Sequence, residues 1–254
     1  VGCVCDSQIR DCNRIIDLGF PVYYAGIRPL DSLGRARVMA YDVPITCGDV
    51  LVQPLDLVFA DFDGVVVESL PLKSAAFKKI FSFTPEHLDE IIAFHLENGG
   101  MSRYDKFRHI YANILHEPLT PEQEERLAGE YVGLIFESML TVPYVEGARE
   151  LLEDCSRLLP LYIVSATPEG EMLEIARRRD LTKYFVRIYG SPKTKAECIR
   201  EILEETGASP DEGLFVGDAP NDWQAAYETG VRFVARIPPG DPDRFTGRPG
   251  VERI

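Results

Sequence analysis

Residues 55–67 read LDLVFADFDGVVV, and this stretch decides the fold. Its apolar run, stopped by Gly64, predicts a buried β-strand that ends at Asp61. Asp61 and Asp63 then lie at the carboxyl end of that strand, the edge where open α/β sheets bind ligands. Two carboxylates so close together repel each other, so we expect a cation between them. Mg²⁺ is the expected cation because it prefers carboxylate and carbonyl oxygens.

The chain beyond residue 145 alternates between helical and strand patterns. The expected helices cover residues 146–158, 168–179, 193–206 and 221–229, and the expected strands cover 161–164, 187–189, 213–216 and 231–235. Strands that alternate with helices predict a parallel sheet covered on both faces. We therefore predict an α/β fold: a Rossmann-like, doubly wound parallel sheet that includes the strand before Asp61.

Residues 71–140, which follow that first strand, are helical in pattern almost throughout. An apolar stripe runs through residues 75–81, and Thr-Pro pairs at 84–85 and 120–121 predict two further helix starts. A helical insert directly after an active-site strand predicts a lid. The predicted organisation is a β-rich segment, a catalytic core in two parts, an α-helical cap and a loose surface tail: residues 1–55, 56–70 with 141–240, 71–140, and 241–254.

Polar side chains end or open several elements at the same edge of the predicted sheet. In chain order they are Asp61, Asp63, Ser165, Lys195, Asp218 and Asp222. Each motif alone has a simpler interpretation: an Asp-x-Asp-Gly run is also typical of an acidic turn, and a serine after a strand is usually a cap or turn residue. Their joint occurrence favours one shared site.

Two positions in this set have alternatives. Ser165 directly follows the apolar strand, but Thr167 could instead supply the hydroxyl. Lys195 and Lys193 both lie at the start of the helix that follows Pro192, and the residues alone leave both open.

The four motifs, in this order, resemble the haloacid dehalogenase superfamily over about residues 56–240. The resemblance implies a Mg²⁺-dependent phosphatase, and the insert at 71–140 looks like the C1 cap of phosphoglycolate-phosphatase-like members. Asp61 would be the nucleophile that forms an aspartyl-phosphate, and Asp63 the general acid and base. Asp63 would also reach the metal through its main-chain carbonyl, Asp218 would be a third protein ligand, and Asp222 would bind a metal water or fix the lysine.

The same resemblance assigns the remaining polar groups to the phosphoryl group and the substrate. Ser165 and the backbone amide of Ala166 would hold a phosphoryl oxygen, and Lys195 would balance the charge shared by Asp61 and the phosphate. Arg103, in the run 98–104 of the cap, could contact an anionic distal group or simply lie on the surface. The second acid, Asp63, favours phosphoryl transfer from an oxygen ester over dehalogenation or phosphonate cleavage.

These motifs predict hydrolysis of a small phosphorylated metabolite, such as a sugar phosphate or a phosphoglycolate-like compound. A phosphomutase of the same superfamily is the nearest alternative, because there the substrate rather than water attacks the intermediate. The sequence motifs alone do not separate the two.

Residues 1–67 have a second resemblance, to the regulator-of-ribonuclease-activity-A family with its class II 4-hydroxy-4-methyl-2-oxoglutarate aldolases. The matching text includes DSQIRD at 6–11, PLDSLGR at 29–35 and VPITCG at 43–48. In the aldolases an Arg-Asp pair, here Arg10-Asp11, binds substrate and metal, but the upstream half of that fold is missing. Strands are expected at 22–25, 37–43 and 50–53, and a helix at 7–18. The alternatives for this segment are a 2-oxo-acid lyase and a surface for homo-oligomer assembly.

Composition limits the partners. The net charge of −14 argues against nucleic acid and against an anionic membrane surface, and no apolar run is long enough to span a bilayer. The chain starts at Val1 without a signal-type segment, which is typical of a fragment or a processed start. The six cysteines show no C-x-x-C spacing, which favours a reduced, cytoplasmic protein, and a metal site at Cys3, Cys5 and Cys12 is the weaker alternative.

Overall fold

The structure is a computed structural model that describes residues 3–9, 22–27, 45–47, 50–53, 56–156, 159–238 and 240–254. The chain separates into two compact units, Val1–Pro54 and Leu55–Ile254. No helix in these described ranges is both long enough and apolar enough to cross a membrane.

The described part of the first unit is made of short strands. β1 (Cys3–Ile9) pairs in parallel with β2 (Val22–Ile27), and β3 (Ile45–Cys47) pairs antiparallel with β4 (Val50–Val52). The strands expected at 22–25 and 50–53 are therefore confirmed. The helix expected from residue 7 is wrong where it can be checked, because residues 7–9 belong to β1. The strand expected at 37–43 and the Arg10-Asp11 pair lie outside the described residues.

The second unit contains a six-stranded sheet in the order β10-β9-β8-β5-β6-β7, and every neighbouring pair is parallel. The strands are β5 (Leu57–Ala60), β6 (Leu161–Pro168), β7 (Arg187–Ser191), β8 (Gly213–Gly217), β9 (Arg232–Ala235) and β10 (Val251–Arg253). The strand of the opening motif, β5, lies in the middle of the sheet between β8 and β6. From β5 the chain continues to β6 on one side, whereas β8 lies on its other side. In doubly wound sheets a ligand site forms at such a change in strand order.

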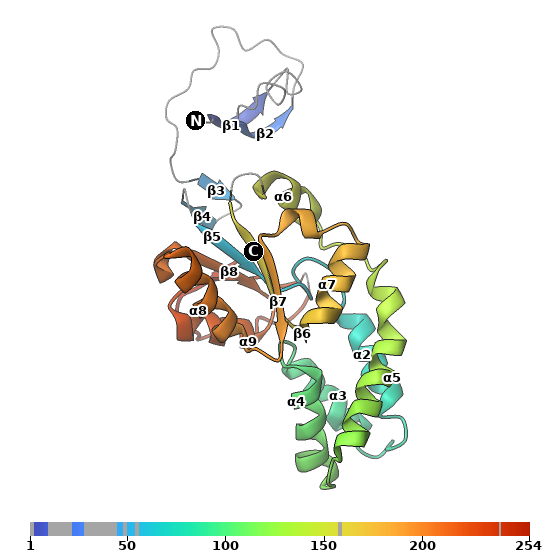
Figure 1. The fold of residues 1–254 in the computed structure, drawn as a ribbon. Helices are drawn as coiled ribbons and strands as arrows, with labels where there is room; N and C mark the ends of the chain where they lie inside the picture. The colour runs from blue at the N-terminus through green and yellow to red at the C-terminus, as the bar shows by residue number, and fades with distance from the viewer. Residues whose placement is uncertain are drawn as a thin grey trace, which may run out of the picture. The chain divides into compact units, whose positions relative to one another are not determined.

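Helices cover both faces of this sheet, so the predicted α/β class is confirmed (Figure 1). They are α6 (Ala148–Cys155), α7 (Glu169–Arg178), α8 (Lys195–Thr206) and α9 (Pro220–Thr229). Along β6, Leu161 and Ile163 pack in the cluster that includes α7, whereas Tyr162 and Val164 pack in the cluster of α8 and α9. Successive side chains of a strand point to opposite faces, so one apolar run contributes to both cores.

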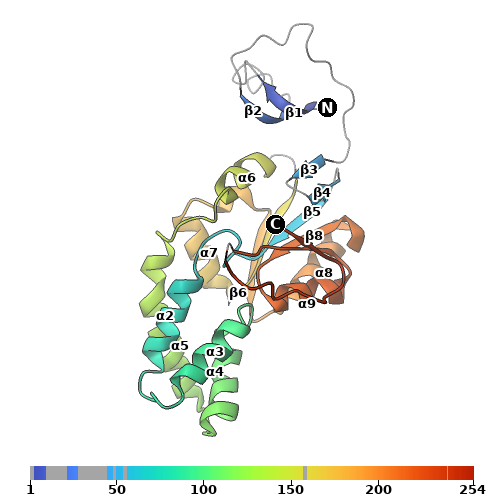
Figure 2. The ribbon, with the colours of Figure 1, turned by 180° about the vertical axis from the view of Figure 1, so that it is seen from behind.

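The cap consists of α2 (Leu70–Ile80), α3 (Leu88–Glu97), α4 (Arg103–His109) with a π-helical turn at Ile110–Leu115, and α5 (Pro121–Met139) (Figure 2). The start of α5 follows the sequence signal, since Thr120 and Gln123 form a capping box around Pro121. The Thr84-Pro85 signal lies four residues before the observed start of α3.

An aromatic cluster holds the cap together. Phe77 of α2 lies 5.8 Å from Phe107 of α4 and 5.4 Å from Tyr131 of α5, measured between ring centroids. All three rings are buried. Because burying such a ring contributes about 1.5–3 kcal/mol, this cluster fixes α2, α4 and α5 relative to one another.

The C-terminal residues are not a loose tail, contrary to the sequence-based expectation. β10 extends the sheet by pairing with β9, and the buried ring of Phe245 lies 5.4 Å from that of Phe233. The indole of Trp223 also donates a hydrogen bond to the carbonyl of Pro249. The Pro- and Gly-rich composition of this stretch therefore reflects turns between packed residues rather than freedom from the core.

Candidate active site

Asp61 lies at the carboxyl end of the central strand and is buried. Its Oδ1 accepts a hydrogen bond from the amide of Phe62 at 2.7 Å, and its Oδ2 accepts one from Lys195 at 2.6 Å. Burial raises the pKa of Asp61 to about 6, while the charge of Lys195 opposes that rise. The carboxylate is thus oriented by two donors and is suited to accept further positive charge.

Lys195 is the first residue of α8, and the start of that helix is fixed by a capping box between Thr194 and Glu197. Its buried ammonium donates to Asp61 and, at 2.5 Å, to Asp222. Burial opposes the charge, but the carboxylates of Asp222 and Asp61 raise the pKa of Lys195 above its ordinary value. Lys193, the alternative, is exposed and pairs with Glu201 instead.

Asp218 lies in the turn between β8 and α9, and Asp222 lies in the first turn of α9. Oδ2 of Asp222 accepts hydrogen bonds from the amides of Asp218 and Ala219, at 3.1 and 3.0 Å, which fixes this turn. Gly217 is required there, because a Cβ at that position would lie 2.3 Å from the Cβ of Asp222. The turn therefore presents the Asp218 side chain to Asp61.

These three acids fit a divalent cation. Carboxylate oxygens of Asp61, Asp218 and Asp222 all lie within 4.8 Å of one another. Burial, followed by the charges of Asp222 and Asp61, raises the pKa of Asp218 well above its ordinary value. Within the described ranges, no side chain donates a hydrogen bond to the Asp218 carboxylate. A buried acid beside other acids, with oxygen donors of this kind, is the environment that Mg²⁺ would stabilise.

Gly64 leaves room for this cluster. It has a φ of +71°, and a Cβ built on it would lie 2.2 Å from Oδ2 of Asp218. Arg236 holds the same turn, since its guanidinium donates to the carbonyl of Gly64 at 3.0 Å and pairs with Glu68. The glycine of the Asp-x-Asp-Gly motif is thus required both for its positive φ and because a side chain there would collide with Asp218.

Asp63 faces a different set of donors. Its Oδ1 accepts from the hydroxyl of Ser69 at 2.5 Å, and its Oδ2 lies 2.5 Å from Nζ of Lys73 and 3.3 Å from Oγ1 of Thr167. Burial would raise the pKa of Asp63, but Lys73 and Ser69 outweigh it and hold that pKa below its ordinary value. The pKa values of the two acids of the opening motif, separated by one residue, are therefore shifted in opposite directions.

The hydroxyl candidates lie on β6, which continues to Pro168 instead of ending at Val164 as expected. Oγ of Ser165 accepts a hydrogen bond from the amide of Thr167 at 3.1 Å, and Ser165 is buried. Ala166 and Thr167 line the cavity between the sheet edge and the cap, and Ser165 is absent from that lining among the described residues. The hydroxyl of Thr167, the alternative, contacts Asp63.

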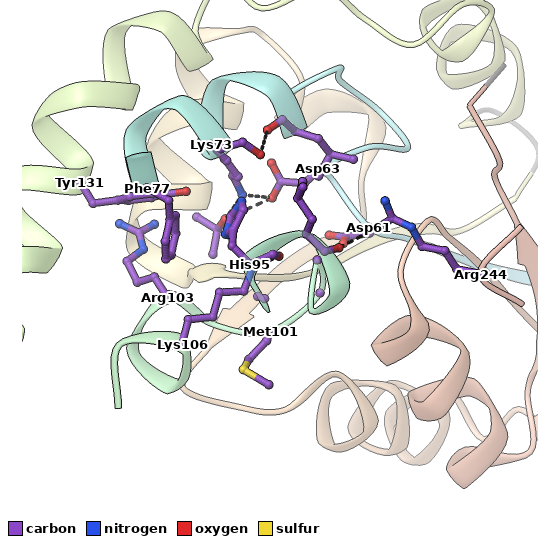
Figure 3. Close-up of a pocket in the computed structure, with 17 residues that line it drawn as sticks. Asp61, Asp63, Lys73, Phe77, His95, Met101, Arg103, Lys106, Tyr131 and Arg244 are labelled. Carbon is purple, nitrogen blue, oxygen red and sulfur yellow. Dashed lines mark hydrogen bonds and ion pairs between the residues drawn. The ribbon is translucent and has the colours of Figure 1, made fainter. Parts of the chain in front are cut away.

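This cavity of ≈ 50 Å³ connects the sheet edge to the cap (Figure 3). Asp61 and Asp63 lie on its core side. The cap contributes residues from α2 to α5 and from the turn before α4, among them Lys73, Phe77, His95, Met101, Arg103, Lys106 and Tyr131. One ordered water needs about 10–15 Å³ by this measure, so the space suits a group with a few heavy atoms.

The cap meets the core closely at Gly99 and Gly100. A Cβ on Gly100 would lie 3.0 Å from the Cβ of Asn221 and 3.2 Å from that of Ala219. The turn before α4 therefore packs on the turn that carries Asp222, which places the cap over the acidic cluster.

Arg103, the cap residue singled out from sequence, lines the cavity but is not free. Its guanidinium pairs with Glu171 of α7 at 2.9 Å and lies 4.6 Å from the ring centroid of Tyr131. Both partners of the ion pair are largely buried. In this arrangement Arg103 joins cap to core, and its role toward substrate stays a prediction.

Three buried, titratable cavity residues are among those that sequence motifs did not indicate: Lys73, His95 and Lys106. A signal existed for two of them. Lys73 precedes Phe77 by one helical turn on the buried face of α2, and Lys106 directly precedes the buried Phe107. A lysine within an apolar stripe is a candidate for a buried charge. His95 carries no comparable signal, because its neighbours Phe94 and Leu96 fit an ordinary helix.

Comparison with protein families divides the chain at the opening stretch. Residues 58–236 match the family model described as Haloacid dehalogenase-like hydrolase, and residues 1–67 match the one described as Aldolase/RraA. A Halalkalibacterium halodurans protein that carries the name 4-hydroxy-4-methyl-2-oxoglutarate aldolase is 36% identical over 66 residues, which are 26% of this chain and 31% of its own length. Both resemblances seen in the sequence are confirmed.

The larger region also has curated relatives. Phosphoglycolate phosphatase 1 of Pseudomonas aeruginosa is 26% identical over 70% of this chain and 68% of its own length. A phosphorylated carbohydrates phosphatase of Thermotoga maritima is 24% identical over 71% of this chain and 84% of its own length. Among solved structures, CbbY of Rhodobacter sphaeroides has a TM-score of 0.61 at 16% identity, covering 78% of this chain and 92% of that one. At that identity the likeness concerns the fold alone.

Proposed function

The chain belongs to the haloacid dehalogenase-like hydrolases, and on that premise we propose that it is a Mg²⁺-dependent phosphatase acting on a small phosphorylated metabolite. The observation that carries the proposal is the placement of Asp61, Asp63 and Lys195. Asp61 is hydrogen-bonded to Lys195 on one side of the site, and Asp63 pairs with Lys73 beside the same cavity. The names of the relatives support a phosphatase.

In the first step, a carboxylate oxygen of Asp61 attacks the phosphorus of the substrate. The bond from that oxygen to phosphorus forms while the bond from phosphorus to the ester oxygen breaks, which leaves an aspartyl-phosphate and an alkoxide. The alkoxide takes a proton from Asp63. Lys73 holds Asp63 charged at rest, so Asp63 would take up this proton from solvent when the bound phosphoryl group shares the charge of Lys73.

In the second step, water replaces the alcohol on the side of Asp63. Asp63 accepts a proton from the water, whose oxygen attacks phosphorus, and the bond to Asp61 breaks to release inorganic phosphate and restore the carboxylate. The depressed pKa of Asp63 suits this step, because the carboxylate must be ionised to act as a base.

Lys195 and the end of β6 are proposed to bind the phosphoryl group. Lys195 already neutralises Asp61 and would share its charge with the phosphoryl oxygens. The amide of Ala166 and the hydroxyl of Ser165 or Thr167 would hold another oxygen. Asp61, the main-chain carbonyl of Asp63 and Asp218 would hold Mg²⁺, with Asp222 fixing the lysine or a metal-bound water. When bound, the ion would offset the negative charge of the acids and of the phosphoryl group.

A phosphoester panel tests this proposal. The full chain is assayed for inorganic phosphate release with Mg²⁺, and Asp61→Asn serves as the blank. We expect release from at least one small phosphomonoester and a loss of at least about 10³-fold in the variant, because an amide is a far weaker nucleophile. Its circular dichroism should match that of the wild type.

Two outcomes would contradict the assignment. Turnover of Asp61→Asn near the wild-type rate would exclude Asp61 as the nucleophile. Conversion of a phosphorylated substrate to an isomer without phosphate release would favour the phosphomutase instead.

A further inference from the structure

Lys106 is a buried cation in the cap wall of the cavity. Only 3% of its surface is exposed, and its ammonium contacts the carbonyl of His95 and the Nδ1 of the same residue, each at 3.2 Å. Both of these partners are neutral acceptors, because burial and the charge of Lys106 lower the pKa of His95 to about 3. Across the described ranges, no carboxylate forms an ion pair with Lys106.

The buried cations of the sheet-edge site and of the cavity differ from Lys106 in this respect. Lys195 pairs with Asp61 and Asp222, Lys73 pairs with Asp63, and Arg103 pairs with Glu171. Each of those charges is therefore compensated within the protein. Burying a charge without an opposite one is costly, so a retained ammonium of this kind calls for a partner that the described residues do not provide.

The chemistry of the wall also favours an oxyanion as that partner. Burial, together with the charge of Lys73, lowers the pKa of Lys106 to about 7, so a bound anion would restore its full charge. An ammonium has three donors, and two of them are used on His95. The ring of Phe77 also lies 5.5 Å from the ammonium, a cation–π contact that uses no hydrogen-bond acceptor. The third donor remains for a ligand oxygen in a cavity that Lys106 lines.

From this geometry we propose that Lys106 selects phosphomonoesters that carry a second anionic group, which its ammonium binds while the phosphoryl group lies at Asp61. This inference rests on the proposed phosphatase activity and deepens it. The second group is an oxyanion, either a carboxylate or another phosphate. Since the cavity is small, the two groups must be separated by few atoms, as in a phosphorylated short-chain hydroxy acid.

Matched pairs of substrates test the proposal on the full chain. 3-Phosphoglycerate and glycerol 3-phosphate differ in a carboxylate against a hydroxymethyl group, and glycerol 1,3-bisphosphate and glycerol 3-phosphate differ in a second phosphate. We expect kcat/KM to favour the anionic member of at least one pair by about tenfold or more, the range of a charged hydrogen bond. The pair that shows the preference identifies the oxyanion.

The variant Lys106→Met should reduce that preference ratio to within about twofold of unity, because it keeps length and removes charge. Lys106→Arg should keep a preference for the anion. The matched control is Lys78→Met, the same substitution at an exposed position of the same cap, which should leave the ratio unchanged. Thermal melting of all three variants separates a loss of folding from a loss of selectivity.

The wild-type enzyme alone can overturn the proposal. Equal efficiency toward both members of each pair would assign Lys106 to cap packing, as would an unchanged ratio in Lys106→Met. Absence of phosphate release from every phosphoester would instead overturn the proposed phosphatase function, so the two failures are distinguishable.

Discussion

The acidic sheet edge, which we call the floor (Asp61, Asp63, Asp218, Asp222 and Lys195), and the cap wall of the cavity hold buried lysines in different ways. Lys195, on the floor, lies between the carboxylates of Asp61, which follows β5, and Asp222, in the first turn of α9. Lys106, on the wall, contacts a histidine ring and a carbonyl. On the floor, carboxylates neutralise the charge of Lys195, and unbalanced negative charge remains only in the acidic cluster that would hold a metal. On the wall, no carboxylate of the described residues pairs with Lys106, so its charge is left for a ligand to neutralise. This difference suggests that the floor performs a chemistry shared by many substrates, and that the wall decides which substrate enters.

The largest effect should come from removing the buried cation of the floor, Lys195. Lys195→Met leaves Asp61 and Asp222 without their shared cation, and removing one partner of a buried ion pair typically costs about 3–5 kcal/mol. We expect a clear loss of stability in urea denaturation together with a loss of phosphatase activity of at least about 10²-fold.

Lys193→Met is the matched control for that experiment. Its partner Glu201 lies on the surface, so we expect no measurable change in activity or in the denaturation midpoint. Equal effects of the two substitutions would contradict the assignment of Lys195 to the site.

A smaller effect should follow from crowding the metal cluster. Gly64→Ala forces a side chain into a φ of +71°, which costs about 1–2 kcal/mol, and directs its Cβ at Asp218. We expect the Mg²⁺ concentration for half-maximal activity to rise about tenfold, because the new methyl group would displace the Asp218 carboxylate from its position as a metal ligand and so weaken ion binding.

Gly207→Ala separates backbone strain from steric contact with Asp218 as the cause of the change. Gly207 has the same φ of +71°, but a Cβ at that position would meet nothing within 4 Å. The substitution should lower stability by a similar amount and leave the Mg²⁺ dependence unchanged. A rise in the Mg²⁺ requirement in both variants would show that strain, and not contact with Asp218, is responsible.

The smallest expected effect is a change of substrate preference with pH, which follows from the charge of Lys106. Because the pKa of Lys106 is lowered to about 7, its charge is present below that pH and is lost above it. The charged groups that act on it keep their state near neutrality: the pKa of His95 is about 3, that of Lys73 is raised and that of Asp63 is lowered. Asp218, the remaining carboxylate that acts on Lys106, would be held ionised by Mg²⁺ throughout the assay.

The preference for 3-phosphoglycerate over glycerol 3-phosphate, as a ratio of kcat/KM, should therefore fall several-fold between pH 6 and pH 8.5. The ratio cancels changes in the shared phosphoryl chemistry, and kcat/KM reports the free enzyme. A ratio that stays constant over this range would mean that Lys106 remains fully charged or plays no part in binding.

The residues of the floor could be predicted from the sequence because strand ends are local features. The residues after β5 and β8 and the start of α8 are fixed by the backbone of the sheet, so their meeting at one edge follows from the parallel topology. The same reasoning placed the end of β6 at Val164 and expected a loose tail. Those two expectations failed because strand length and the pairing of β10 depend on neighbours that no local pattern contains.

The sequence by itself determined the fold class, the family and the set of acids and lysine at the sheet edge. Only the tertiary structure decided that Lys195 and not Lys193 meets Asp61, that Lys73 pairs with Asp63, and that Lys106 contacts His95 rather than an acid of the described residues. The physical reason lies in the two kinds of element. A strand in a parallel sheet fixes where its last side chain points, whereas a cap helix can turn several faces toward a cavity, and its packing on other helices selects one.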